Sequence, residues 1–238
     1  MAAGADGLMP AGTTGEGVLL DDDELVSVVE TAVRAAGGAA TVLAHVGRAA
    51  TAATVRLARR ALDAGADAVS AVVPYYYAVD DAQVVAHFRA LISAADGTAA
   101  YAYTIPARTG NELSAAAAGE LVAAGLGGIK DSTKSLERHE EYLALGTRVL
   151  MGSDGLVLDA LRLGAAGCVS AIANLRPELL VGLVRAHAAG RRDVAEELQR
   201  DVSALRTALA SEPALVGLKR AVAARIEGYP SGLRAPLG

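Results

Sequence analysis

The run Gly127-Gly128-Ile129-Lys130-Asp131-Ser132 decides how this sequence is interpreted. Its apolar residues are typical of a short buried strand, and Lys130 stands near the end of that strand. A lysine in this place either extends its ammonium into solvent or is held as a reactive amine, because burial disfavours the charged form and lowers the pKa. Position alone leaves both interpretations open.

Other short apolar runs lie on both sides of this strand, with amphipathic helical patterns between them. The predicted strands cover Asp6–Ala11, Thr41–Val46, Ala68–Val73, Ala99–Ile105, Gly127–Ser132, Arg148–Gly152 and Gly167–Ala173. Buried strands that alternate with helices predict an α/β fold with a parallel sheet, and the TIM (β/α)8 barrel is the leading candidate. Because a closed barrel needs eight strands, we expect this chain to lack the first strand–helix unit.

The last part of the sequence predicts only helices. Three helical segments, at about residues 176–189, 193–209 and 213–227, follow the last predicted strand. The first segment would pack as the last barrel helix, and the others would form a small helical appendage. We therefore expect a catalytic barrel domain over residues 1–190 and an appendage over residues 191–238.

The composition limits the class of protein. The 238 residues are 53% apolar and 21% charged, with a net charge of −5. This is enough for one large core, without the basic surplus of a protein that binds nucleic acid or a membrane surface. Cys168 is the only cysteine, which excludes an internal disulfide. No apolar run reaches the roughly 18 residues of a membrane span, and no signal-peptide pattern begins the sequence. We expect a cytoplasmic protein whose partners are small molecules.

Residues suited to chemistry follow the predicted strands, at the carboxyl edge where barrel enzymes keep their active sites. Tyr103 lies near the end of the strand before Lys130, so the two side chains can meet at this edge. A desolvated lysine beside a phenol can attack a ketone and form a Schiff base. Taken singly, Tyr103 could instead be a core tyrosine, and Arg108, which follows it, could be a surface arginine.

Other chemistries have little support. The four histidines, His45, His87, His139 and His187, are far apart and match no zinc motif, which disfavours a metal-dependent aldolase. The sequence contains no dinucleotide motif after a strand, no Walker loop and no Gly-x-Ser-x-Gly elbow. We expect no metal and no separate cofactor.

Several motifs together resemble those of the dihydrodipicolinate synthase/N-acetylneuraminate lyase family, in order and in spacing over nearly the whole chain. They are Gly12-Thr13-Thr14-Gly15-Glu16, Pro74-Tyr75-Tyr76, Tyr103-Thr104-Ile105-Pro106-Ala107-Arg108-Thr109-Gly110, Gly128-Ile129-Lys130 and Gly152-Ser153-Asp154. The resemblance implies a class I, pyruvate-dependent lyase or aldolase on a TIM barrel, usually a homotetramer. Its substrates would be a keto acid and an aldehyde.

The resemblance also implies roles for individual residues. Lys130 would form the Schiff base with pyruvate, and Tyr103 would relay protons. Thr13 and Thr14 would hold the pyruvate carboxylate. In the synthase branch, a tyrosine that matches Tyr76 is donated across a subunit interface and completes a proton relay with Thr14 and Tyr103. The remaining pocket residues would be Gly152, Asp154 and Ser170, although a serine at such a place can also be a turn residue.

The branch within the family is open. Arg108 resembles the synthase branch, where it meets the carboxylate of the second substrate, and this favours condensation of pyruvate with aspartate semialdehyde by a 4-hydroxy-tetrahydrodipicolinate (dihydrodipicolinate) synthase. The surroundings of His45 and Ser70 resemble the lyase branch, so an N-acetylneuraminate lyase or a 2-keto-3-deoxy sugar acid aldolase is the alternative. Gly155 stands where that branch has an acidic residue that binds the sugar chain. A keto-acid-binding relative without catalysis is the alternative from another class.

Overall fold

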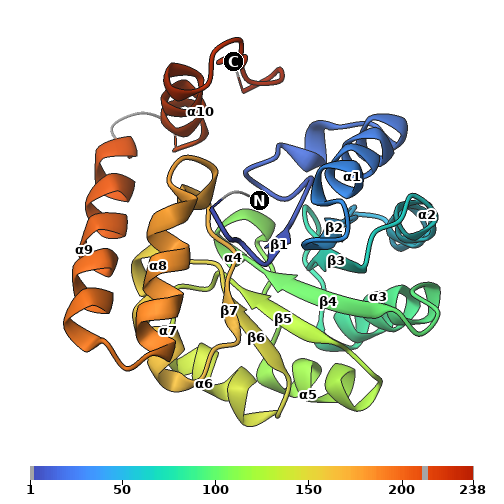
Figure 1. The fold of residues 1–238 in the computed structure, drawn as a ribbon. Coiled ribbons are helices and arrows are strands. Elements are labelled where there is room, and N and C mark those ends of the chain that lie inside the picture. The colour runs from blue at the N-terminus through green and yellow to red at the C-terminus, as the bar shows by residue number, and fades with distance from the viewer. Residues whose placement is uncertain (1–2, 211–213, 238) are drawn as a thin grey trace. The chain divides into compact units, whose positions relative to one another are not determined.

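Strands and helices alternate along the chain in the computed structural model, which describes residues 3–210 and 214–237 (Figure 1). The sheet has seven strands in the order β1 to β7, and β1 to β5 pair in parallel. The strands are β1 (Gly7–Leu8), β2 (Thr41–His45), β3 (Ala68–Val72), β4 (Ala99–Thr104), β5 (Gly128–Asp131), β6 (Arg148–Met151) and β7 (Gly167–Cys168). Each strand lies beside its predecessor, as in a (β/α)8 barrel. The predicted TIM-barrel fold with seven strands is confirmed.

The helices follow the strands as predicted. They are α1 (Asp22–Ala36), α2 (Thr51–Asp63), α3 (Asp81–Ala94), α4 (Pro106–Thr109), α5 (Ala115–Ala123), α6 (Leu136–Ala144), α7 (Val157–Leu163), α8 (Pro177–Ala188), α9 (Arg192–Leu209) and α10 (Ala214–Arg225). Capping boxes begin α1 and α3, where Asp21 pairs with Glu24 and Asp80 pairs with Gln83. Each box satisfies two backbone N–H groups that a helix start leaves without partners. The last predicted helical segment begins at residue 213, which lies outside the described residues.

The first and last strands are shorter than predicted. β1 and β7 contain two residues each, whereas the sequence pattern extends over six or seven. After β1 the Pro10 carbonyl still accepts a hydrogen bond from the His45 N–H, at 3.1 Å. Ala11 then takes a left-handed conformation, with φ at 58°, which turns the chain away from the strand. Local turn geometry therefore ends the strand where apolar character alone would continue it.

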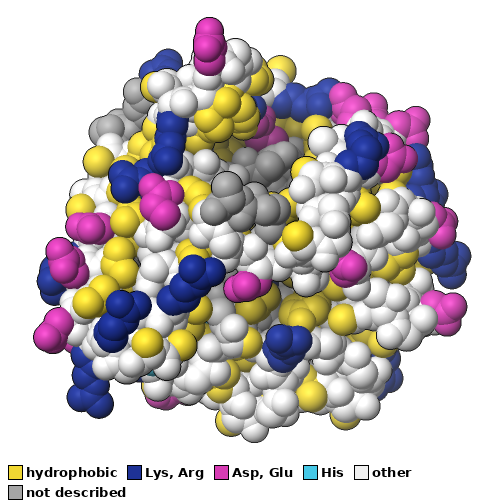
Figure 2. Space-filling view, viewed as in Figure 1, with side chains coloured by type: hydrophobic (Ala, Val, Ile, Leu, Met, Phe, Trp, Pro, Cys, Tyr) yellow, Lys and Arg dark blue, Asp and Glu magenta, His cyan; other side chains and the backbone are white. Residues whose placement is uncertain are grey.

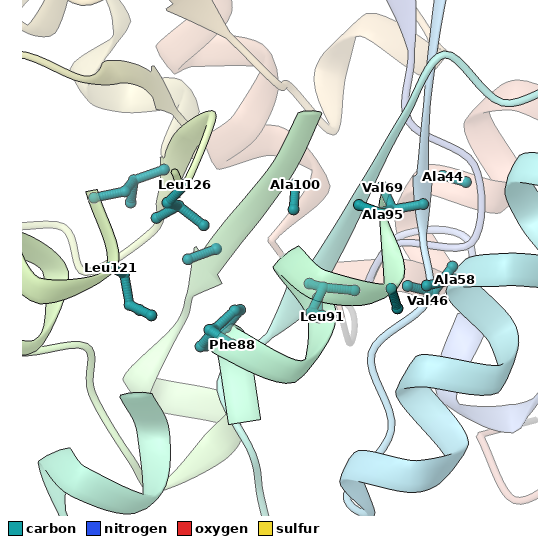
Figure 3. Packing of buried hydrophobic residues seen from close by; sticks show 14 of the residues in the cluster. Ala44, Val46, Ala58, Val69, Phe88, Leu91, Ala95, Ala100, Leu121 and Leu126 are labelled. Atoms are coloured by element: carbon teal, nitrogen blue, oxygen red, sulfur yellow. The ribbon is translucent and has the colours of Figure 1, made fainter. Parts of the chain in front are cut away.

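One face of the strands builds the apolar core. The core cluster includes alternate strand residues such as Ala44, Val69 and Ala102, together with Phe88 and Leu91 of α3. Figure 3 shows part of this cluster between strands and helices. Because successive side chains of a strand point to opposite faces, the residues between these positions point away from the cluster. This second face carries the side chains of the candidate site.

The described residues divide into two compact units. The first unit is Asp6–Leu150, and the second contains residues 151–237 together with residues 3–5. Within the second unit, Gln199 of α9 donates a hydrogen bond to the Asp154 carbonyl at 3.0 Å and accepts one from the Leu158 N–H at 2.9 Å. These bonds join α9 to the segment that carries Asp154. The domain boundary expected between residues 190 and 191 stays a prediction.

Charged side chains of both signs are interspersed on the face seen in Figure 2. Ion pairs also form between α1 and α2, where Arg56 pairs with Asp22 at 2.6 Å and Arg60 pairs with Asp23 at 2.7 Å. Exposed pairs of this kind contribute about 1 kcal/mol or less each. Among the described helices, none combines the length and apolar character that a membrane span requires.

Candidate active site

Lys130 and Tyr103 lie directly opposite each other on neighbouring strands of the first unit. The register of β4 and β5 pairs the two residues, and the Lys130 Nζ lies 3.9 Å from the centroid of the Tyr103 ring. Both side chains are buried, with 7% and 2% of their surfaces exposed. The ring holds the amine at a fixed place, since the ring face attracts a cation and shields it from water. The two residues predicted to meet at the sheet edge therefore do meet.

The Tyr103 hydroxyl is part of a short chain of hydroxyl groups. Its oxygen lies 3.1 Å from the Thr13 Oγ1, and Ser132 forms a second side-chain hydrogen bond with it. Burial raises the pKa of the Tyr103 phenol, while the bonds from Thr13 and Ser132 and the charge of Arg108 oppose that rise. The phenol therefore stays protonated at neutral pH and can both donate and accept a proton through a neighbouring hydroxyl.

The turn that carries Thr13 is held by close backbone packing. A Cβ on Gly17 would lie 1.7 Å from the Ala11 carbonyl oxygen, so only glycine fits there. Arg48 is a second anchor of this turn, since its guanidinium donates to the carbonyls of Gly17 and Leu20, each at 2.9 Å. The sequence did not predict this role. The neighbouring Thr14 is half-buried in the same turn. Packing and Arg48 together place Thr13 against Tyr103.

His45 lies beside Tyr103 on the same face of the sheet. Its ring stands edge-on to the tyrosine, with centroids 5.9 Å apart. The Val72 N–H donates to Nε2 at 3.2 Å, which assigns the proton of a neutral imidazole to Nδ1. Burial and the positive charges of Lys130 and Arg48 lower the pKa of His45 to about 3. His45 is thus an uncharged neighbour of the lysine.

Ser70 lies next to His45 and is also fully buried. The register of β2 and β3 pairs the two residues. The His45 Nδ1 and the Ser70 Oγ have no hydrogen-bond partner within the described ranges 3–210 and 214–237. Buried polar atoms in this condition favour a water or a ligand hydroxyl as a partner. The sequence marked both residues only as a signal of the family branch, and it did not predict that they lie beside the lysine–tyrosine pair.

Two buried histidines, His45 and His87, make the fold sensitive to acid. Burial lowers the pKa of His87 to about 4 and that of His45, together with nearby charges, to about 3, whereas an unfolded histidine has a pKa near 6.5. Because both folded-state pKa values are depressed, the unfolded chain binds more protons than the folded chain does once the pH falls below about 6.5. Stability is therefore retained above this value and lost toward pH 3 to 4. We expect each histidine to lower the free energy of unfolding at pH 5 by about 2 kcal/mol, relative to neutral pH.

Urea unfolding at pH 7.5 and at pH 5 measures this loss. The variant His87→Gln, which cannot be protonated, should show a pH-dependent loss that is smaller than that of the wild type by about 2 kcal/mol. Equal free energies of unfolding at both pH values, or equal pH dependence in the wild type and the variant, would contradict the expected result.

Behind Lys130, a buried acid–histidine pair anchors the end of β5. The Asp131 Oδ2 lies 2.8 Å from the His139 Nδ1, and both side chains are fully buried. The other oxygen, Oδ1, accepts hydrogen bonds from the Thr133 N–H and hydroxyl at 2.8 and 2.7 Å. These bonds join β5 to α6 and to the loop between them. Such a network restricts the strand that carries the lysine.

Tyr76 and Arg108 are exposed in the single chain. Tyr76 has 85% of its surface exposed, and its ring lies edge-on to Tyr77 with centroids 4.9 Å apart. It is therefore not part of the buried lysine–tyrosine pair within one chain. Arg108 lies on α4, and its charge acts on the Tyr103 phenol. The structure thus brings Lys130, Tyr103 and Thr13 together, with Arg108 in their vicinity.

The remaining predicted site residues belong to the second unit. The Ser170 hydroxyl donates a short hydrogen bond to the Asp154 carboxylate and accepts one from the Ala173 N–H at 3.1 Å. Asp154 is buried, and Gly152 precedes it in a half-buried position. The structure therefore joins Asp154 and Ser170. No cluster of three or more His, Cys, Asp or Glu side chains that could hold a metal occurs in the part of the chain described.

The fold is that of a class of pyruvate-dependent lyases and synthases. Residues 1–238 match the family model described as the Dihydrodipicolinate synthetase family, and the chain belongs to this family. An "Uncharacterized DapA-like lyase" of Halobacterium salinarum is 41% identical over 99% of this chain and 78% of its own length. The 4-hydroxy-tetrahydrodipicolinate synthase of Methanosphaerula palustris is 33% identical over 100% of this chain and 82% of its own length.

Solved structures show the same similarity. Dihydrodipicolinate synthase from Aquifex aeolicus superposes with a TM-score of 0.94 at 30% identity, and covers 100% of this chain and 82% of its own. KD(P)GA from T. tenax has a TM-score of 0.88 at 32% identity, with 99% and 82% covered. YagE from E. coli K12, solved in complex with pyruvate, has a TM-score of 0.91 at 26% identity, with 99% and 82% covered. The predicted family and enzyme class are confirmed.

Proposed function

We propose that this protein condenses pyruvate with a small aldehyde that bears a carboxylate, through a Schiff base on Lys130. The leading acceptor is aspartate semialdehyde, the substrate of a 4-hydroxy-tetrahydrodipicolinate synthase. The observation that carries the proposal is the Lys130 Nζ held 3.9 Å from the centroid of the Tyr103 ring, with the Tyr103 hydroxyl bonded to Thr13. The relative from Methanosphaerula palustris, which is named for this activity, supports it.

The chemistry begins at the lysine amine. The amine of Lys130, in its uncharged form, attacks the ketone carbon of pyruvate, and the ketone oxygen leaves as water after it has taken up protons. The resulting iminium ion accepts the electron pair that is left when a proton departs from the pyruvate methyl group. The enamine carbon then attacks the aldehyde carbon, and the aldehyde oxygen takes up a proton. Finally, the amino group of the acceptor, or water, attacks the iminium carbon, which releases the product and the lysine amine.

Each proton transfer needs a group that can both give and take a proton. Tyr103 is suited to this role, because it stays protonated and shares a hydrogen bond with Thr13. Thr13 and Thr14 offer hydroxyls from one turn, and we propose that they hold the pyruvate carboxylate. The exposed Tyr76 would reach the site of a neighbouring copy in a homo-oligomer, with a tetramer as the expected state. No separate cofactor is needed for these steps.

Gly152, Asp154 and Ser170 of the second unit stay predicted substrate-binding residues. The catalytic barrel would then extend over residues 1–190, with the helical appendage in residues 191–238. We also propose that the protein acts in the cytoplasm on small keto acids and aldehydes.

Arg108 is the reason for proposing an acceptor with a carboxylate. Its guanidinium is a rigid fork that can bind a carboxylate through two parallel hydrogen bonds. Loss of such charge-assisted bonds typically costs about 1.5 to 3 kcal/mol, so Arg108→Ala should raise the KM for aspartate semialdehyde about 10- to 150-fold. Steady-state kinetics measures this change, and trapping of the pyruvate adduct should be unaffected. An unchanged KM would show that Arg108 does not bind the acceptor.

A sugar-acid aldolase is the second candidate. The unpartnered His45 Nδ1 and Ser70 Oγ could bind the hydroxyls of a sugar acid, and the similarity to KD(P)GA from T. tenax supports this activity. A paired assay distinguishes the candidates. The proposed function predicts pyruvate consumption with aspartate semialdehyde and little pyruvate release from N-acetylneuraminate or 2-keto-3-deoxy sugar acids. The reverse result would favour the aldolase, and no turnover with any of these compounds would favour a binding protein.

A further inference from the structure

One side chain, Asn111, forms three hydrogen bonds to the backbone of the loop that carries Tyr76. Its Nδ2 donates to the carbonyls of Pro74 and Tyr77, each at 2.8 Å. Its Oδ1 accepts from the Val79 N–H at 3.2 Å. Both amide donors and one acceptor position are therefore used on this one segment, between β3 and α3. Asn111 lies just outside the motif that ends at Gly110, so the sequence pattern did not identify it.

The loop needs anchors of this kind. Tyr76 has φ at 81°, in the left-handed region that is strained for a bulky side chain. The rings of Tyr76 and Tyr77 are 85% and 74% exposed and lie against each other. Burial of these rings therefore contributes little in one chain, and the backbone bonds to Asn111 hold the strained residue in place.

Asn111 is itself fixed to the segment that follows Tyr103. The Thr109 hydroxyl donates to the Asn111 carbonyl at 2.6 Å and to the Ile105 carbonyl at 3.1 Å. A second link lies nearby, where the Ser114 hydroxyl donates to the Asp81 carboxylate at 2.6 Å. The segment after β4, which includes α4 with Arg108, is thus joined to the loop after β3, which carries Tyr76.

We propose that Asn111 is a positioning residue that holds Tyr76 in the conformation needed for proton transfer. The inference rests on the proposed function, in which Tyr76 supplies a hydroxyl to the proton relay. Asn111 does not touch the substrate, and it acts only through the loop of residues 74–79. Its effect on turnover should therefore depend on the Tyr76 hydroxyl, whereas formation of the Lys130 adduct should not depend on it.

A double-mutant cycle tests this dependence. Asn111→Ala removes all three bonds, and Asn111→Asp removes the donors to Pro74 and Tyr77 but keeps an acceptor for Val79. We expect either change to lower kcat about tenfold in the wild-type background and less than about twofold in the Tyr76→Phe background. Borohydride trapping of pyruvate should be unchanged in both. Asn174→Ala, which removes one local hydrogen bond at 3.1 Å, is the matched control and should leave kcat unchanged.

Hydrogen exchange of the peptide that covers residues 74–79 gives a readout independent of activity. Exchange should be faster in Asn111→Ala than in the wild type, with a smaller increase in Asn111→Asp, because Val79 keeps its acceptor. Equal loss of kcat in both backgrounds, or unchanged exchange in Asn111→Ala, would overturn the inference. If Tyr76→Phe alone leaves kcat unchanged, the proposed relay fails, and exchange still decides whether Asn111 holds the loop. Asn111→Asp provides the comparison if Asn111→Ala does not fold.

Discussion

Replacing Lys130 with alanine is expected to reduce turnover of pyruvate and aspartate semialdehyde to the rate without enzyme. The amine supplies the nitrogen of the iminium ion, and without that ion nothing accepts the electron pair of the pyruvate methyl group. Because Lys130 is buried over the Tyr103 ring, its removal also leaves a cavity. Lys130→Met keeps most of the stem volume and should lose the same activity while retaining the melting temperature more closely.

Lys134 provides the matched control for this experiment. It is an exposed lysine that lies four residues further along the chain, so Lys134→Gln should change turnover by less than about twofold, as is usual for surface substitutions. Retention by Lys130→Met of more than about a tenth of the wild-type rate would contradict a covalent role, since loss of a nucleophile typically costs several orders of magnitude.

The change Tyr103→Phe is expected to lower kcat by about two to four orders of magnitude, the range of a positioned acid–base group. The substitution removes only the hydroxyl that lies 3.1 Å from the Thr13 Oγ1. The ring remains beneath the lysine, so the adduct site keeps its shape and the fold should keep its stability. Single-turnover and steady-state rates with pyruvate and the acceptor measure the loss.

Tyr101 is the control for this second prediction. It lies two residues earlier on β4, so it points to the same face of the sheet as Tyr103. Its ring lies beside Gly128, where a Cβ would come within 2.4 Å of the Tyr101 Cε1. Tyr101→Phe should reduce kcat by less than about threefold, a smaller effect than that of a positioned acid–base group. A similarly small loss in Tyr103→Phe would remove that residue from the mechanism.

Lys130 and Tyr103 could be predicted as neighbours because the information that places them is local. Each ends an apolar run, one strand–helix unit apart, and parallel strands in sequential order bring such positions to one edge. The register of β4 and β5 then pairs them directly. The first strand was predicted, but its short length was not, because the left-handed conformation falls on Ala11 and not on a glycine.

The surroundings of this pair depend on contacts between distant segments. His45 reaches Tyr103 only through the registers of β2, β3 and β4, and neither residue type nor spacing specifies that approach. Arg48 holds the Thr13 turn through carbonyls that are 28 and 31 residues away. Asp131 meets His139 only because α6 packs back on β5. The sequence around His139 matched no metal motif, and it could not identify Asp131 as the partner of this histidine.

Tyr76 was identified by its motif, while its strained, exposed conformation became visible only in the structure.

The central claim is a covalent bond between Lys130 and pyruvate. Borohydride reduces such an imine to a stable secondary amine, so intact mass and peptide mapping can detect one reduced pyruvate adduct and locate it. We predict a single adduct on Lys130 in the wild-type protein and no adduct in Lys130→Ala. Absence of an adduct from the wild-type protein, or an undiminished adduct in Lys130→Ala, would contradict the claim.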